Sequence, residues 1–212
     1  MPVFLQHREL HYCWAVWKIE ETADELLAVL PHADAYAQEA RRFASESRRL
    51  EWLTARVLLY AMLGKEKRIA YYPNGRPYLP DDPRHISISH TKGYVAVILG
   101  ENPLSGVGID IEQYGERVCR VADRFVRDDE IIHSYKDTDI WALLLHWSAK
   151  ETVYKCLDES EVDFREHLHV MPFILGEKGT FDVCEYRTSR KRKYVVHYLL
   201  HLKFVLTWTC FY

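Results

Sequence analysis

One heptapeptide, GVGIDIE at residues 106–112, restricts the structure of this chain more than any other stretch. Its apolar residues alternate with Gly108, Asp110 and Glu112, and a period of two is typical of a β-strand with one buried face. The opposite face then carries two carboxylates roughly 6.6 Å apart along the backbone. Carboxylates this close repel each other and need a compensating cation.

Two interpretations of this face remain open from the heptapeptide alone. Gly108 leaves room for a bulky group to approach, so a divalent metal with a phosphate ligand would suit the face. A solvated edge strand with an acidic outer face also explains the pattern, and it needs no ligand.

The nonapeptide WSAKETVYK at residues 147–155 favours the first interpretation. It lacks Gly and Pro, and its apolar spacing predicts a helix over residues 147–157. Glu151 and Lys155 then share one helix face, with Lys150 beside them. An ordinary surface pair of this kind contributes only about 0.3–0.5 kcal/mol. The functional interpretation is a magnesium site on Asp110, Glu112 and Glu151, with two lysines for phosphate.

The two motifs together resemble the signature pair of the 4′-phosphopantetheinyl transferases. The chain length is similar to that of the Sfp type, a single chain built as a pseudo-dimer. Three further motifs occur in the order found in that family: NGRP at 74–77, SISH at 87–90, and a Phe-x-x-x-x-Glu segment at 125–130. Ser87 and Thr91 depart from the family pattern, which commonly has Asn and Ser there, although Thr91 keeps a hydroxyl.

The resemblance implies a set of site residues. Contacts with coenzyme A are expected from Arg48, Arg49, Arg56, Arg76, Ser89, His90, Lys150 and Lys155. Catalytic roles are expected for Glu151, Lys155, Lys150 and Glu130. Plain alternatives exist for several of these residues: the arginines of residues 41–56 can line a solvated helix face, Arg76 can be an exposed turn residue, and Glu130 can be a carboxylate favoured at a helix N-terminus.

Further elements follow from periodicity and turn residues. Helices are expected at 22–30, 36–43 and 46–63, with a broken helix at 117–134 that contains Glu130, and the nonapeptide is expected within a helix over 137–158. Strands are expected at 12–19, 69–72, 85–89, 94–99, 173–175, 180–187 and 194–209. Ser89 and His90 are placed in the turn of the hairpin formed by the third and fourth of these strands.

An internal sequence similarity predicts the domain organisation. The segment TARVLLYAML at residues 54–63 aligns with SAKETVYKCL at 148–157 at a constant offset. We therefore expect an α+β fold of two similar halves, residues 1–102 and 103–212. The resemblance implies that a pseudo-twofold axis relates them, that the first half contributes to coenzyme A binding, and that the second carries the metal and catalytic residues.

Composition limits the compartment and the partners. The five cysteines are odd in number and never form a CxxC motif, which argues against disulfides and zinc and favours a reducing cytoplasm. The formal charge of −3 gives no reason to expect nucleic acid. No apolar run approaches the length of a membrane span, about 20 residues. A monomer is expected.

The resemblance implies transfer of 4′-phosphopantetheine from coenzyme A to a serine of an acyl or peptidyl carrier protein, with Mg²⁺ as cofactor and 3′,5′-ADP as product. Two alternatives remain: a magnesium-dependent hydrolase of nucleotides or phosphodiesters, and a non-catalytic binding module for acidic proteins.

Overall fold

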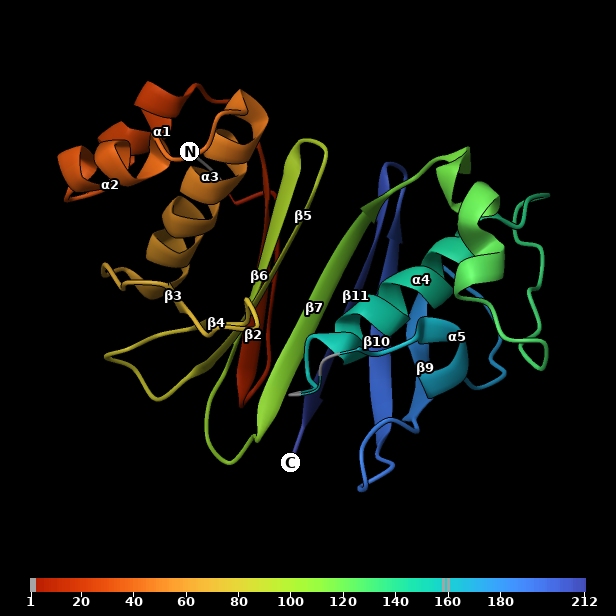
Figure 1. Cartoon of the computed structure of the whole chain (residues 1–212). Helices are drawn as coiled ribbons and strands as arrows, with labels where there is room; N and C mark the ends of the chain where they lie inside the picture. The colour runs from red at the N-terminus through yellow and green to blue at the C-terminus, as the bar shows by residue number, and fades with distance from the viewer. Residues whose placement is uncertain (1–2, 158, 160) are drawn as a thin grey trace. The chain divides into compact units, whose positions relative to one another are not determined.

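The structure is a computed structural model that describes residues 3–157, 159 and 161–212 (Figure 1). The chain divides into two compact units, Met1–Asn102 and Pro103–Tyr212. Each unit contains an antiparallel sheet and one long helix that packs on it. The expected α+β class is therefore confirmed.

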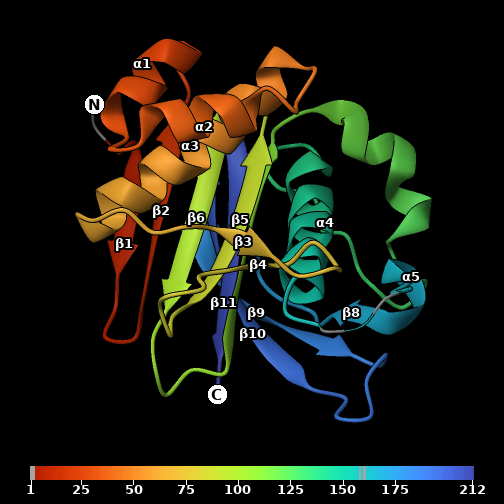
Figure 2. The same cartoon turned by 60° about the vertical axis from the view of Figure 1, so that its left-hand side comes forward.

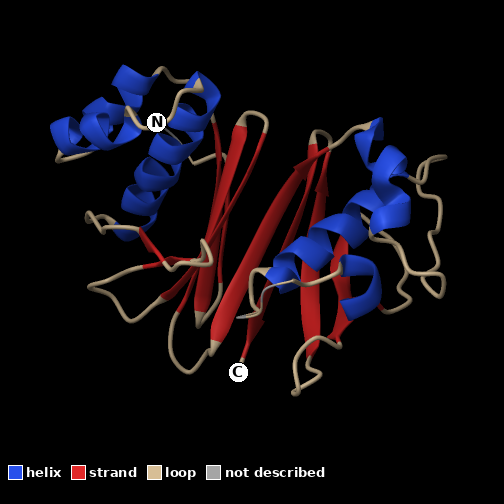
Figure 3. Ribbon diagram, viewed as in Figure 1, coloured by secondary structure: helices blue, strands red, loops and turns tan. Residues whose placement is uncertain are grey.

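The first unit is built on a four-stranded sheet in the order β1-β2-β6-β5. Its strands are β1 (Leu5–Arg8), β2 (Tyr12–Lys18), β5 (His85–Thr91) and β6 (Tyr94–Gly100). Helices α1 (Ala23–Val29), α2 (Ala33–Ala40) and α3 (Glu46–Leu63) belong to the same unit (Figure 3). A small hairpin joins β3 (Ala70–Tyr71) to β4 (Pro77–Tyr78).

Local sequence signals fix the ends of α3. The Ser45 side chain accepts a hydrogen bond from the Arg48 amide at the N-terminus. Gly64 ends the helix in the left-handed conformation (φ 64°), and its N–H donates to the Tyr60 carbonyl. Leu53 and Val57 of this helix are buried in the core of the first unit. The predicted bounds of this helix, 46–63, agree with the structure.

The hairpin of β5 and β6 is longer than predicted. Ser89 and His90 lie within β5, where they pair with Ala96 and Val95, and the two-residue turn is formed by Lys92 and Gly93. Gly93 has a positive φ (79°) at the second turn position, a conformation that glycine adopts without steric cost. The prediction that Ser89 and His90 lie in the turn is therefore wrong.

The second unit contains a five-stranded sheet in the order β7-β11-β10-β9-β8. Its strands are β7 (Gly106–Gln113), β8 (Leu168–Val170), β9 (Lys178–Glu185), β10 (Lys193–His201) and β11 (Phe204–Phe211). Helix α4 (Ile140–Tyr154) packs on this sheet, chiefly on β11 and β7. A 3₁₀ helix, η1 (Glu116–Arg124), and the short α5 (Phe164–His167) complete the unit (Figure 2).

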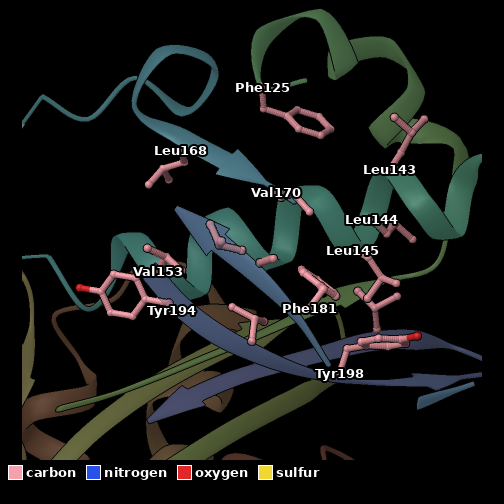
Figure 4. Close-up of a cluster of buried hydrophobic side chains, with 14 of the residues drawn as sticks. Phe125, Leu143, Leu144, Leu145, Val153, Leu168, Val170, Phe181, Tyr194 and Tyr198 are labelled. Carbon is pink, nitrogen blue, oxygen red and sulfur yellow. The ribbon is translucent and has the colours of Figure 1, made fainter. Parts of the chain in front are cut away.

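The core of the second unit lies between α4 and the sheet. Figure 4 shows Leu145 and Val153 of α4 among Phe181, Tyr194 and Tyr198 of β9 and β10. Because α4 is buried along most of its length, its sequence is apolar around much of its circumference.

Several predictions for the second unit are wrong in detail. The broken helix expected at 117–134 is only η1, so Glu130 lies in the loop that follows it and not at a helix N-terminus. No strand forms at 173–175, and the segment 194–209 is two strands joined by a turn. Positive-φ backbone at Lys136 and Asp137 marks the irregular connection to α4.

Candidate functional site

The acidic face of β7 lies against α4, which buries Asp110 and partly buries Glu112. Asp110 is only 3% exposed, although β7 is an edge strand of its sheet. Gly108 makes this close approach possible, because a Cβ at this position would lie 2.3 Å from the Thr152 carbonyl oxygen of α4. The bulky group that Gly108 admits is therefore the helix backbone. The alternative of a solvated acidic edge strand does not hold.

Asp110 receives hydrogen bonds from two side chains of the WSAKETVYK segment. Ser148 Oγ donates to Oδ2 at 2.8 Å, and Lys155 Nζ donates to Oδ1 at 2.8 Å. Lys155 also donates to the Ile109 carbonyl at 3.0 Å. These contacts place the carboxylate, the hydroxyl and the ammonium group at the junction of β7 and α4.

Glu112 and Glu151 both have a raised pKa, and burial and the charge of Asp110 contribute to both shifts. Trp147 Nε1 donates to Glu112 Oε1 at 2.7 Å. Burial, together with the charge of Asp110, raises the pKa of Glu112 to about 7, and the Trp147 hydrogen bond opposes this rise. Burial and then Asp110 also raise the pKa of Glu151 to about 7, against the effect of Lys155. A nearby cation would relieve both carboxylates.

The donor chemistry of these residues fits a hard divalent cation. Carboxylate oxygens are the ligands that Mg²⁺ prefers. Burial and the charge of Asp110 raise the pKa of both Glu112 and Glu151, and the positive charge of Lys155 only partly offsets this effect. Within the part of the chain that the structure describes, no three His, Cys, Asp or Glu side chains already form a metal-binding arrangement. This includes Asp110, Glu112 and Glu151, so their role as metal ligands stays a prediction.

Lys150 and Glu130 form a separate, fully buried pair. The side chains of both are 0% exposed, and Lys150 Nζ lies 2.8 Å from Glu130 Oε1. Lys150 also donates to the carbonyls of Phe125 and Phe164, at 2.6 and 3.1 Å, and Glu130 accepts from the Val170 amide at 2.7 Å. Burial lowers the pKa of Lys150, and Glu130 opposes this effect.

The buried pair connects α4 to its surroundings. Through these bonds Lys150 ties the helix to the loop after η1, to α5 and to β8. The roles in catalysis and coenzyme A binding expected for Lys150 and Glu130 therefore rest on the resemblance alone, while their contacts describe a structural link.

The first unit brings several of the predicted coenzyme A residues together. A cavity of about 150 Å³, called here the N-terminal cavity, has a lining that includes Arg48, Arg56 and His90. Its other lining residues are Phe43, Glu51, Trp52, Ala55, Tyr71, Gly75, Pro77 and Ile88. Gly75 and Pro77 flank Arg76, and the Arg76 amide donates to Asn74 Oδ1 at 3.1 Å.

Arg56 is fixed within the wall of the N-terminal cavity. Its guanidinium lies 3.3 Å from the centre of the Trp52 ring and donates to the Trp52 carbonyl at 2.9 Å. Burial lowers the pKa of Arg56, and Tyr71 opposes this shift.

Arg49 is not among the lining residues, and Ser89 is buried in β5. Arg48 and Arg56 are therefore better placed than Arg49 to meet a ligand in this cavity.

Sequence reasoning missed three residues that organise these sites. Trp147 and Ser148 belong to the WSAKETVYK motif. The Trp147 indole donates a hydrogen bond to Glu112, and the Ser148 hydroxyl donates one to Asp110. Glu51 lies one helical turn after Arg48, a spacing that predicts only an ordinary surface pair.

Helices in the described residues are too short or too polar to cross a membrane. In comparisons with known proteins, residues 106–209 match the family model described as the 4′-phosphopantetheinyl transferase superfamily. No curated protein matches the chain.

Proposed function

Because residues 106–209 form a domain of the 4′-phosphopantetheinyl transferase superfamily, we propose that this protein transfers 4′-phosphopantetheine from coenzyme A to a serine of an acyl or peptidyl carrier protein. The carrier is converted from its apo to its holo form, and 3′,5′-ADP is released. The observation that carries the proposal is the grouping of Asp110, Glu112, Glu151 and Lys155 at the junction of β7 and α4 within the matched domain.

In the reaction, the serine oxygen attacks the phosphorus that bears the pantetheine arm. The new bond forms as the bond from that phosphorus to the bridging oxygen of 3′,5′-ADP breaks, and the serine proton must be removed. Glu151 is our candidate to take this proton, because it lies on the α4 face beside Asp110 and Lys155. Lys155 is held at 2.8 Å from Asp110 and can neutralise charge on the phosphoryl oxygens.

A magnesium ion on Asp110, Glu112 and Glu151 would supply further neutralisation of the pyrophosphate. The chain's own residues prepare for such an ion. Ser148 and Trp147 hold Asp110 and Glu112 in place, as expected for groups that orient metal ligands.

In the first unit, the N-terminal cavity offers cationic groups to the phosphate end of coenzyme A. Arg48, Arg56 and His90 line it together with the rings of Trp52 and Tyr71. Aromatic rings and guanidinium groups suit a nucleotide with a phosphate ester. We assign the 3′-phosphate to Arg48 and His90, and Arg56 adds a buried positive charge to the same cavity wall. A cytoplasmic monomer is part of the same proposal.

The test is mass spectrometry of purified apo carrier proteins after incubation with the protein, coenzyme A and Mg²⁺. We expect one carrier serine to gain the mass of one phosphopantetheine, with an equal amount of 3′,5′-ADP released. Release of 3′,5′-ADP without any carrier protein would instead support a hydrolase. An unmodified carrier panel and intact coenzyme A would contradict the proposal.

A further inference from the structure

An acidic side chain lies between two of the groups that line the N-terminal cavity. Glu51 Oε2 lies 3.0 Å from Arg48 Nη1 and 3.3 Å from His90 Nδ1. Arg48 Nη1 also contacts His90 Nε2, so the three side chains form a closed triangle. Glu51 is the most buried of the three, with a side chain 13% exposed compared with 53% for Arg48 and 39% for His90.

The chemistry of the three groups defines their hydrogen bonds. A guanidinium group can only donate, so His90 Nε2 accepts from Arg48. His90 Nδ1 then carries the hydrogen and donates to Glu51. The carboxylate therefore determines both the tautomer and the orientation of the imidazole, while it also restrains the longer and more exposed Arg48.

A carboxylate in a cavity for a phosphate is unfavourable by charge alone. Its presence is explained if it reduces the cost of ordering the ligand's partners, because fixing a rotamer-rich side chain during binding opposes association. Glu51 is anchored for this task on the first turns of α3, where Ser47 Oγ donates to its other oxygen at 3.3 Å.

We propose that Glu51 is a positioning residue for the phosphate end of coenzyme A, holding Arg48 and His90 side by side so that both meet the 3′-phosphate. The inference rests on the proposed function, which places this end of the ligand in the N-terminal cavity. Glu51 acts through the other two residues and does not itself touch the phosphate.

The test compares two nucleotides that differ only in the 3′-phosphate. Calorimetry with 3′,5′-ADP should show that Glu51→Gln raises Kd about tenfold. The same variant should bind 5′-AMP as the unmodified protein does, because that ligand lacks the group that Arg48 and His90 would contact. Glu46→Gln is the matched control, since Glu46 is an exposed acid at the start of the same helix.

A double-mutant cycle separates positioning from loss of structure. In an Arg48→Ala background, Glu51→Gln should have a much smaller effect on 3′,5′-ADP binding, because one of the groups that it positions is gone. Equal losses for 3′,5′-ADP and 5′-AMP, or full additivity with Arg48→Ala, would overturn the proposal. If Glu51→Gln lowers thermal stability, the comparison of the two nucleotides still tests the proposal, because a general loss of structure would weaken the binding of 3′,5′-ADP and of 5′-AMP equally.

Binding and transfer together distinguish this inference from the proposed function. If the unmodified protein transfers phosphopantetheine but Glu51→Gln leaves 3′,5′-ADP binding unchanged, the role of Glu51 is wrong and the function stands. If 3′,5′-ADP binds in a Glu51-dependent way without any transfer, the role of Glu51 stands and the function is wrong. If neither nucleotide binds, both are wrong.

Discussion

Lys155, the C-cap residue of α4, places its ammonium group 2.8 Å from Oδ1 of Asp110, which lies on the edge strand β7. This bond joins the two sequence motifs in space. The Asp110 side chain is 5% exposed and that of Lys155 is 24% exposed, so the cation forms the accessible end of the pair.

Asp110→Asn should abolish most of the transfer activity. The substitution keeps the shape of the side chain but removes the charge that balances Lys155 and that would bind the metal, so we expect kcat to fall at least about 100-fold. Stability should fall by about 1–3 kcal/mol, because Lys155 loses its ionic partner. Asp182→Asn is the control, since Asp182 pairs with the exposed Lys193 on β9 and β10. Steady-state transfer with saturating Mg²⁺ measures the effect, and near-normal turnover would remove Asp110 from the site.

The two lysines of the WSAKETVYK motif should fail in different ways when substituted. Lys150→Met leaves the buried Glu130 without its cation and should cost about 3–5 kcal/mol. Lys155→Met leaves Asp110, whose side chain is 5% exposed, with Ser148 as donor but without its cation, so it should cost about 1–3 kcal/mol, and it should lower transfer by the folded protein as well. Urea denaturation and transfer assays on both variants separate the two roles. A stable Lys150→Met protein with lost transfer would show that Lys150 acts on the ligand.

Without a divalent cation, stability should fall as pH rises toward 8. Glu112 and Glu151 have pKa values of about 7 in the folded protein and near 4.5 when unfolded, so between these values the folded state binds more protons. Their contribution is therefore fully present below pH 4.5 and lost as pH passes through about 7.

We expect this loss to amount to about 2 kcal/mol, because one pKa unit corresponds to about 1.4 kcal/mol and the two carboxyls are partly solvated. Thermal unfolding in EDTA from pH 5 to 8 tests it, and Mg²⁺ should restore stability at the high end. Glu112→Gln with Glu151→Gln should flatten the profile. A melting temperature in EDTA that increases as the pH passes through 7 would contradict the expectation.

Gly108→Ala should destabilise the second unit by about 1–3 kcal/mol. Its new methyl group would lie 2.3 Å from the Thr152 carbonyl and 2.7 Å from Cys156 Sγ, so α4 would have to move away from β7. Gly115→Ala is the matched control, since a Cβ there meets nothing within 4 Å. Chemical denaturation of both variants gives the difference, and equal effects would show that the contact is unimportant.

Each chain should bind one coenzyme A. In the first unit, the β2 residues in the core with α3 are Ala15 and Trp17, so this strand presents no carboxylate to its helix. Among the strands of the described residues, the acidic strand β7 belongs to the second unit. Titration calorimetry with Mg²⁺ should therefore show one equivalent of ligand per chain, whereas two equivalents of similar affinity would contradict this asymmetry.

The sequence was most informative where a periodic pattern and an end signal coincided. Helix α3 begins after Ser45 and ends at Gly64 as predicted, since the cap residues act locally. The acidic strand β7 and the helical state of the nonapeptide also followed from residue spacing, and residues 106–209 match the model of the family that the motifs resemble.

What the sequence did not show depended on packing between distant segments. Lys150 stands beside Glu151 in the chain, yet it is buried because Glu130 and two carbonyls from other segments receive its hydrogen bonds. Gly108 was expected to admit a ligand, but the group that approaches it is α4, whose position is set by the whole core. Neither outcome is encoded by local periodicity.

The edge position of β7 also has a consequence for how the protein is made. Its neighbour in the sheet is β11, the last strand of the unit, so β7 leaves the ribosome long before its backbone can pair. In that interval, the alternating Val107, Ile109 and Ile111 form an aggregation-prone template. Asp110 and Glu112 interrupt this template with charge and would discourage pairing between nascent chains. The same two acids that we assign to the metal would then protect the strand during synthesis.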